Sequence, residues 1–61
     1  MKTIENILIK RDGITAEEAK DLVSEASEQL QNYLAQGDFI SAENVCAEFF
    51  GLEPDYVDQL I

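Results

Sequence analysis

Residues 15–35 read TAEEAKDLVSEASEQLQNYLA, and this stretch decides the fold of the 61-residue chain. Thr15 and Glu18 have the spacing of a capping box, in which each side chain accepts a hydrogen bond from the other residue's backbone N–H. At about 100° per residue, the apolar side chains of the stretch fall within an arc of roughly 120°. They are Ala19, Leu22, Val23, Ala26, Leu30, Tyr33 and Leu34. The sequence therefore predicts a helix of about twenty residues that begins at Ala16 and buries one face.

The opposite face of this helix is nearly all carboxylate. Its acidic residues fall between about 220° and 320° on the same helical wheel. They are Glu17, Glu18, Asp21, Glu25 and Glu28. Like charges at i, i+4 are mutually destabilising, and two interpretations of the row stay open. It keeps a small apolar protein soluble, or it binds a basic partner surface and imitates the charge of a nucleic-acid backbone.

The charge of the chain excludes several classes of function. Thirteen acidic and four basic residues, with no histidine, give a net charge of −9. All four cations lie in residues 1–20, and residues 21–61 contain nine acidic residues and no basic one. Nucleic-acid backbones and anionic lipids are bound by clustered Lys and Arg. We therefore expect neither direct nucleic-acid binding nor membrane binding.

Length and residue types argue against catalysis. A chain this short buries only about 60% of the surface that its unfolded form exposes, which leaves no room for a catalytic cleft beside the core. One cysteine, Cys46, and no histidine exclude a zinc site and leave the thiol without an activating base. The apolar run at residues 7–9 is far shorter than a signal-peptide core or a membrane span. We expect one cytoplasmic domain over residues 1–61 that is not an enzyme and needs no cofactor or metal.

Turn and capping signals divide the rest of the chain into three shorter helices. Thr3 can cap the first, which Gly13 ends, and Gly37 ends the long helix. In the third, which Asp38 or Ser41 can cap, apolar residues recur at helical spacing. They are Phe39, Ala42, Val45, Cys46, Phe49 and Phe50. We expect the three phenylalanines in the core together with Tyr33, but for one of Phe49 and Phe50 an interface is an equally open alternative. Pro54 can begin a last helix whose apolar face is Tyr56, Val57, Leu60 and Ile61. The sequence predicts an all-α bundle of one long central helix with three shorter helices packed on it.

The segment CAEFFGLEPDYVDQLI (residues 46–61) resembles the helix-turn-helix of transcriptional regulators. The helix-turn-helix pattern has a small residue, then a glycine four positions later, and then a β-branched residue six positions after the glycine. In this chain they are Ala47, Gly51 and Val57. The helix that would enter the DNA groove exposes polar and acidic residues where phosphate contacts need cations. These are Glu53, Asp55, Asp58 and Gln59. We expect a helix-turn-helix-like C-terminal pair that does not read DNA.

A second resemblance covers most of the chain. Its motifs are Arg11-Asp12-Gly13-Ile14-Thr15-Ala16-Glu17-Glu18-Ala19, Gly37-Asp38 and Phe50-Gly51-Leu52-Glu53-Pro54-Asp55-Tyr56. With these motifs the chain is similar to a set of short uncharacterised proteins of tailed phages and prophages. The resemblance implies a phage-encoded protein that works in a bacterial host cell, and it implies no particular chemistry.

Two functions are favoured by these observations over a third, DNA binding through residues 46–61. The first is a non-enzymatic module that engages a basic surface of a host or phage protein through Glu17, Asp21, Glu25 and Glu28, with Asp55 and Asp58 as a second patch. The alternative is a protein that self-associates, as a homodimer, through an apolar C-terminal surface. That surface would contain Phe49, Phe50, Tyr56 and Ile61. A domain of this size gains from dimerisation because its own core supplies only a few kcal/mol.

Overall fold

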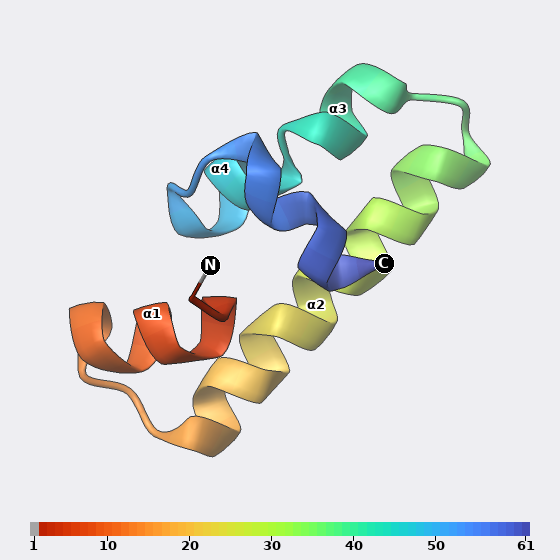
Figure 1. Cartoon of the computed structure of the whole chain (residues 1–61). Coiled ribbons are helices and arrows are strands. Elements are labelled where there is room, and N and C mark those ends of the chain that lie inside the picture. The colour runs from red at the N-terminus through yellow and green to blue at the C-terminus, as the bar shows by residue number, and fades with distance from the viewer. Residues whose placement is uncertain (1) are drawn as a thin grey trace.

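The computed structural model describes residues 2–61, which form five helical elements and no strand (Figure 1). The elements are α1 (Ile4–Asp12), α2 (Ala16–Ala35), α3 (Phe39–Glu43), α4 (Val45–Phe50) and a 3-10 helix, η1 (Pro54–Leu60). This arrangement confirms the predicted all-α fold. The third of the predicted helices is present as two pieces, α3 and α4.

The long helix α2 packs against each of the other four elements. In Figure 1 it runs diagonally, and the other four elements lie on one side of it. The predicted capping box is formed, because Thr15 Oγ1 accepts from Glu18 N at 3.1 Å and Glu18 Oε1 accepts from Thr15 N at 3.4 Å. The helix begins at Ala16 and is 20 residues long, as its sequence predicts.

The core lies between α2 and the elements on its covered side. Small residues of α2, Ala19 and Ala26, are fully buried together with Leu30. Because an alanine side chain ends at Cβ, neighbouring elements can approach the α2 backbone closely at these positions. The other elements contribute Ile4, Leu8, Ala42, Val45, Cys46, Phe50 and Leu60. No polar or charged side chain is buried among residues 2–61, so the core is entirely apolar.

A glycine turn reverses the chain after α2. Gly37 has φ 74°, a left-handed conformation that glycine adopts without a Cβ clash. The N–H of Asp38 donates to the carbonyl of Tyr33 at 2.8 Å, which is the bond of a Schellman motif. The Asp38 carboxylate then accepts from Ser41 N at 3.1 Å and caps α3. The sequence predicts the turn at Gly37, and of the two candidate caps, Asp38 and Ser41, the structure uses Asp38.

The continuous third helix predicted for residues 39–50 is wrong at Asn44. Asn44 has φ −97° and ψ 4°, outside the helical range, and its N–H donates to the Ser41 carbonyl at 3.1 Å. The break at Asn44 does not interrupt the buried stripe, because Ala42, Val45 and Cys46 are all buried. Ala42 stays buried, but Phe39 is 64% exposed, so the prediction that Phe39 belongs to the core is also wrong.

The last helix begins at Pro54 as predicted, but it has 3-10 rather than α geometry. At three residues per turn, side chains at i and i+3 eclipse one another. Val57 and Leu60 therefore share the inward line, and Asp55 and Asp58 share an exposed line that leads on to Ile61. Ile61 is 81% exposed, which corrects the prediction that it lies on the same apolar face as Val57 and Leu60.

Gln59 fastens this C-terminal helix to the beginning of α1. Its Oε1 accepts from the backbone N–H of Ile4 at 2.8 Å, and its Nε2 donates to the carbonyl of Lys2 at 2.9 Å. Ser27 of α2 adds a third link, since its hydroxyl donates to the carbonyl of Leu60 at 2.9 Å. The two ends of the chain are thus joined through side chains that the sequence pattern alone would assign to solvent.

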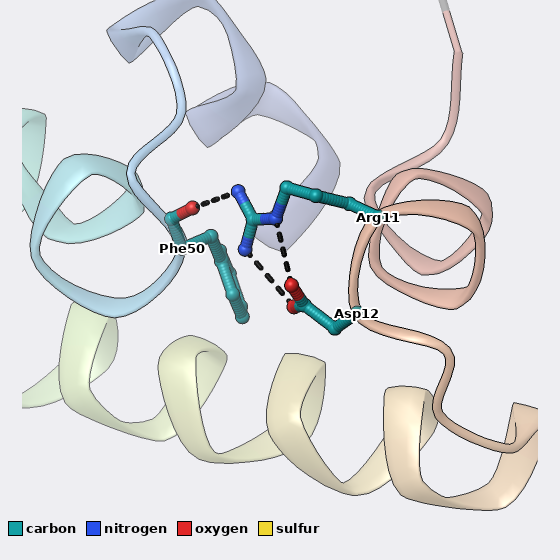
Figure 2. Close-up of polar contacts among 3 residues, drawn as sticks. All are labelled: Arg11, Asp12 and Phe50. Atoms are coloured by element: carbon teal, nitrogen blue, oxygen red, sulfur yellow. Dashed lines mark hydrogen bonds and ion pairs between the residues drawn. The ribbon is translucent and has the colours of Figure 1, made fainter.

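Arg11 makes a comparable connection between α1 and α4. Its Nη1 donates to the backbone carbonyl of Phe50 at the end of α4, while Nε and Nη2 donate to the Asp12 carboxylate at 3.0 and 3.1 Å (Figure 2). A cation at this position also suits the negative end of the helix dipole. One guanidinium therefore holds the last turns of two helices that are distant in sequence.

Candidate protein-binding surface

The four acidic residues of α2 that are predicted to contact a partner lie on the uncovered side of this helix. All four are exposed: Glu17, Asp21, Glu25 and Glu28. At about 100° per residue they point away from the buried Ala19 and Ala26. With a rise of about 1.5 Å per residue, the row extends roughly 16 Å along the helix. We call these four residues the acidic row.

No cation of the described chain pairs with the acidic row. Among residues 2–61 the one ion pair joins Arg11 and Asp12, at 3.0 Å. Its hydrogen bonds hold the pKa of the Asp12 carboxyl below and that of the Arg11 guanidinium above their ordinary values. On α2 itself, Lys20 is the sole cation of residues 16–35. The acidic row therefore presents four carboxylates whose charge is not neutralised by neighbouring side chains.

The second predicted acidic patch is on η1. Asp55 and Asp58 are both exposed, and the 3-10 repeat places them on one line. They are carried by the second element of the helix-turn-helix-like segment, after the Gly51 turn at φ 68°. That element is seven residues long and presents carboxylates on its exposed line. The patch stands on a different element from the acidic row.

The four residues of the predicted apolar surface have different environments. Phe50 is only 4% exposed and belongs to the core, and Tyr56 is half-buried. Phe49 is 38% exposed, with its ring centroid 6.1 Å from that of Phe50, and Ile61 is the most exposed of the four. The surface that remains accessible is therefore contributed mainly by Phe49 and Ile61.

A different exposed apolar group was missed at the sequence level. It lies where α2 turns into α3 and consists of Leu34, Phe39 and Ile40, which are 38%, 64% and 76% exposed. One signal was present in the sequence, because Ile40 lies off the apolar stripe predicted for residues 39–50. We call these three residues the apolar corner.

One surface depression and the single cysteine are the other candidate sites, and the polar group of each has a structural role. A shallow open depression of about 330 Å³ is lined by Thr3, Ile4, Glu5, Val23 and Gln59. The amide of Gln59 is already hydrogen bonded on both of its polar atoms. Cys46 is fully buried, and burial raises the pKa of its thiol. Both observations describe groups that stabilise the fold.

Tyr33 makes the polar contact between α2 and α4. Its hydroxyl donates to a carboxylate oxygen of Glu48 at 3.2 Å. Burial of the ring, and then the hydrogen bond to this carboxylate, raise the pKa of Tyr33 above its ordinary value. The contact lies at the surface and joins two helices, and it leaves the acidic row untouched.

Within residues 2–61, no group of three or more Cys, Asp or Glu side chains is arranged to hold a metal ion. None of the described helices is both long and apolar enough to cross a membrane. In comparisons with known proteins, no family model, curated protein or solved structure matches the chain.

Proposed function

We propose that this chain is a non-enzymatic protein-binding module that engages a basic surface of another protein through the acidic row. Its partner is a host or phage protein with clustered Lys and Arg, and the interaction takes place in the cytoplasm of a bacterial cell that carries the phage or prophage. Binding of this kind would block the partner's own anionic ligand, including a nucleic acid, by occupying the same surface.

One observation carries the proposal. Four exposed carboxylates stand together on the uncovered side of α2, and none forms an ion pair within the described chain. Solubility alone is served equally well by mixed charges, and like charges at i, i+4 destabilise a helix by about 0.2–0.5 kcal/mol per pair. The cost of placing like charges in one row favours a role in complementarity to a positive surface, which also accelerates association.

The test is a pair of variants with the same change in net charge. Asp21→Lys/Glu25→Lys reverses the centre of the acidic row, and Asp55→Lys/Asp58→Lys reverses the patch on η1. Partners are captured from host lysate, identified by mass spectrometry, and their dissociation constants measured at low and high salt. We expect the α2 variant to weaken binding strongly and the η1 variant to weaken it less, with an affinity that falls as salt rises.

Two results would contradict the proposal. One is a partner whose affinity changes neither with salt concentration nor when the charges of Asp21 and Glu25 are reversed. The other is an equal loss in both variants, because bulk charge and not a particular face would then explain binding. Duplex DNA at about 50 mM salt, where backbone electrostatics are strong, is the control ligand, and we expect it not to bind.

Self-association is a second candidate, favoured by the exposure of Ile61 at 81% and Phe49 at 38%. Burial of such side chains against a second copy would add to the stability of a small core. Sedimentation equilibrium over a range of protein concentrations tests it. A dimer that dissociates in Phe49→Ser/Ile61→Ser supports this candidate, and a strict monomer at high concentration excludes it.

A further inference from the structure

The apolar corner is the most concentrated exposure of large apolar side chains in the described chain. Phe39 and Ile40 are consecutive and are 64% and 76% exposed, and Leu34 stands at the end of the helix that precedes them. Apolar residues scattered singly on a surface need no explanation, whereas adjacent ones mark a contact surface. An exposed aromatic next to a branched aliphatic residue is also typical of the anchors that dominate protein interfaces.

The corner is held in place by hydrogen bonds on both sides. The Asp38 carboxylate caps α3 at its beginning. At its end, Asn44 Nδ2 donates to the carbonyl of Ile40 at 2.9 Å. Phe39 lies at the first position of α3 and is exposed, whereas Ala42, Val45 and Cys46 further along the chain are buried. Because the backbone is already fixed, the two side chains can be buried against a partner with little further loss of conformational entropy.

The charged side chains next to the corner are all acidic. Glu43 is exposed and follows Phe39 and Ile40 by four and three residues, so it lies on the same side of α3. Asp38 adds a second carboxylate, and α2 ends here with no basic residue in its last turn. A helix C-terminus carries about half a negative charge and favours a nearby cation. Residues 21–61 supply none.

We propose that the apolar corner packs Phe39 and Ile40 against the apolar face of an amphipathic partner helix that is flanked by Lys or Arg. The flanking cations lie against Glu43, Asp38 and the C-terminal end of α2. A second copy of this chain does not fit, since a symmetric contact would bring the same carboxylates and the same helix ends together. The inference rests on the proposed protein-binding function but does not require the acidic row.

The probe is a synthetic amphipathic helix of about 14 residues with a leucine face flanked by lysines. Its binding is followed by backbone amide chemical shifts of the whole chain. We expect the largest shifts at residues 34–43, and no binding by the same peptide with glutamate in place of lysine. Phe39→Ser/Ile40→Ser should weaken binding by roughly tenfold or more, the loss typical of an interface anchor.

Leu22→Ser is the matched control, because Leu22 is an apolar residue of α2, 37% exposed, outside the corner. It should change the affinity by less than about twofold, within the range of a peripheral contact. Dispersed amide spectra of both variants establish that they are folded. Shifts confined to residues 17–28, or an unchanged affinity of Phe39→Ser/Ile40→Ser, would overturn the inference. So would a dimer of the chain that this variant dissociates.

The acidic-row variant separates this inference from the broader function. If Asp21→Lys/Glu25→Lys still binds the lysine peptide at residues 34–43, the corner acts independently of the row. If that variant alone loses binding and the corner variant does not, the acidic row stands and the corner fails. If the peptide binds at the corner and the affinity of a natural partner does not change when the acidic row is reversed, the corner stands and the acidic row fails.

Discussion

The Arg11 guanidinium donates to the backbone carbonyl of Phe50, 39 positions further along the chain (Figure 2). Through this bond the last turn of α1 closes over the end of α4, and Asp12 orients the guanidinium from the other side. The contact matters for stability because it fixes the C-terminal end of α1, whereas Gln59 holds the beginning of that helix.

Arg11→Ala should therefore lower the urea midpoint of unfolding more than Lys10→Ala does. Both substitutions remove one positive charge from the last turn of α1, so Lys10→Ala controls for net charge and for the helix dipole. Arg11→Lys should recover only part of the loss, because an ammonium lacks the planar fork that reaches two acceptors at once. Equal midpoints for the two alanine variants would show that the Phe50 contact contributes nothing.

Leu30→Ala should destabilise the protein by about 2–5 kcal/mol, the usual cost of truncating a buried leucine. Leu30 is 1% exposed in the centre of α2, and a domain of this size has only about 3–5 kcal/mol to lose. We expect a largely unfolded chain by circular dichroism at room temperature. Ile40→Ala, at a position 76% exposed, should stay within about 0.5 kcal/mol of the parent.

Thr15→Ala should cost about 1 kcal/mol, because it removes the acceptor for the N–H of Glu18 at the beginning of α2. Thr15→Ser retains a hydroxyl at the same place and should recover most of the difference in a urea titration. A Thr15→Ala protein as stable as the parent would mean that packing of α2, and not its cap, determines where the helix begins.

The phenol of Tyr33 should ionise at a pH above the ordinary value for tyrosine. In Tyr56→Phe the chain has a single tyrosine, so ultraviolet absorbance reports Tyr33 alone. Its pKa is raised by burial and by the bond to Glu48, so its contribution to stability is present at neutral pH and is lost as pH rises through the raised pKa. Glu48→Gln should shift the titration part of the way down, and an unshifted titration would contradict this role of Glu48.

Cys46 should resist alkylation in the native protein and react fully once the chain unfolds. The side chain is 0% exposed, and burial raises the pKa of its thiol, which disfavours the reactive thiolate. The rate of labelling in increasing urea should follow the unfolding transition measured by circular dichroism. Rapid labelling without denaturant would indicate that α4 opens locally.

The sequence by itself determined the local structure of this protein. The boundaries of α2, the caps at Thr3, Thr15 and Asp38, and the glycine that ends α2 are set by hydrogen bonds between residues only a few positions apart. Helical periodicity likewise identified which side of α2 is buried and which carries the acidic row. These features do not depend on residues far away in the sequence. For that reason they can be predicted from residue pattern and spacing.

Only the tertiary structure decided which apolar side chains remain exposed. Phe39 at the beginning of α3 and Ile61 after the end of η1 are both exposed, although both residues fit an α-helical stripe in the sequence. Arg11 and Gln59 are polar residues whose structural partners lie 39 and 55 or more positions away. Packing of short elements against α2 selects these conformations, because non-local burial outweighs the small helix propensities of five to seven residues.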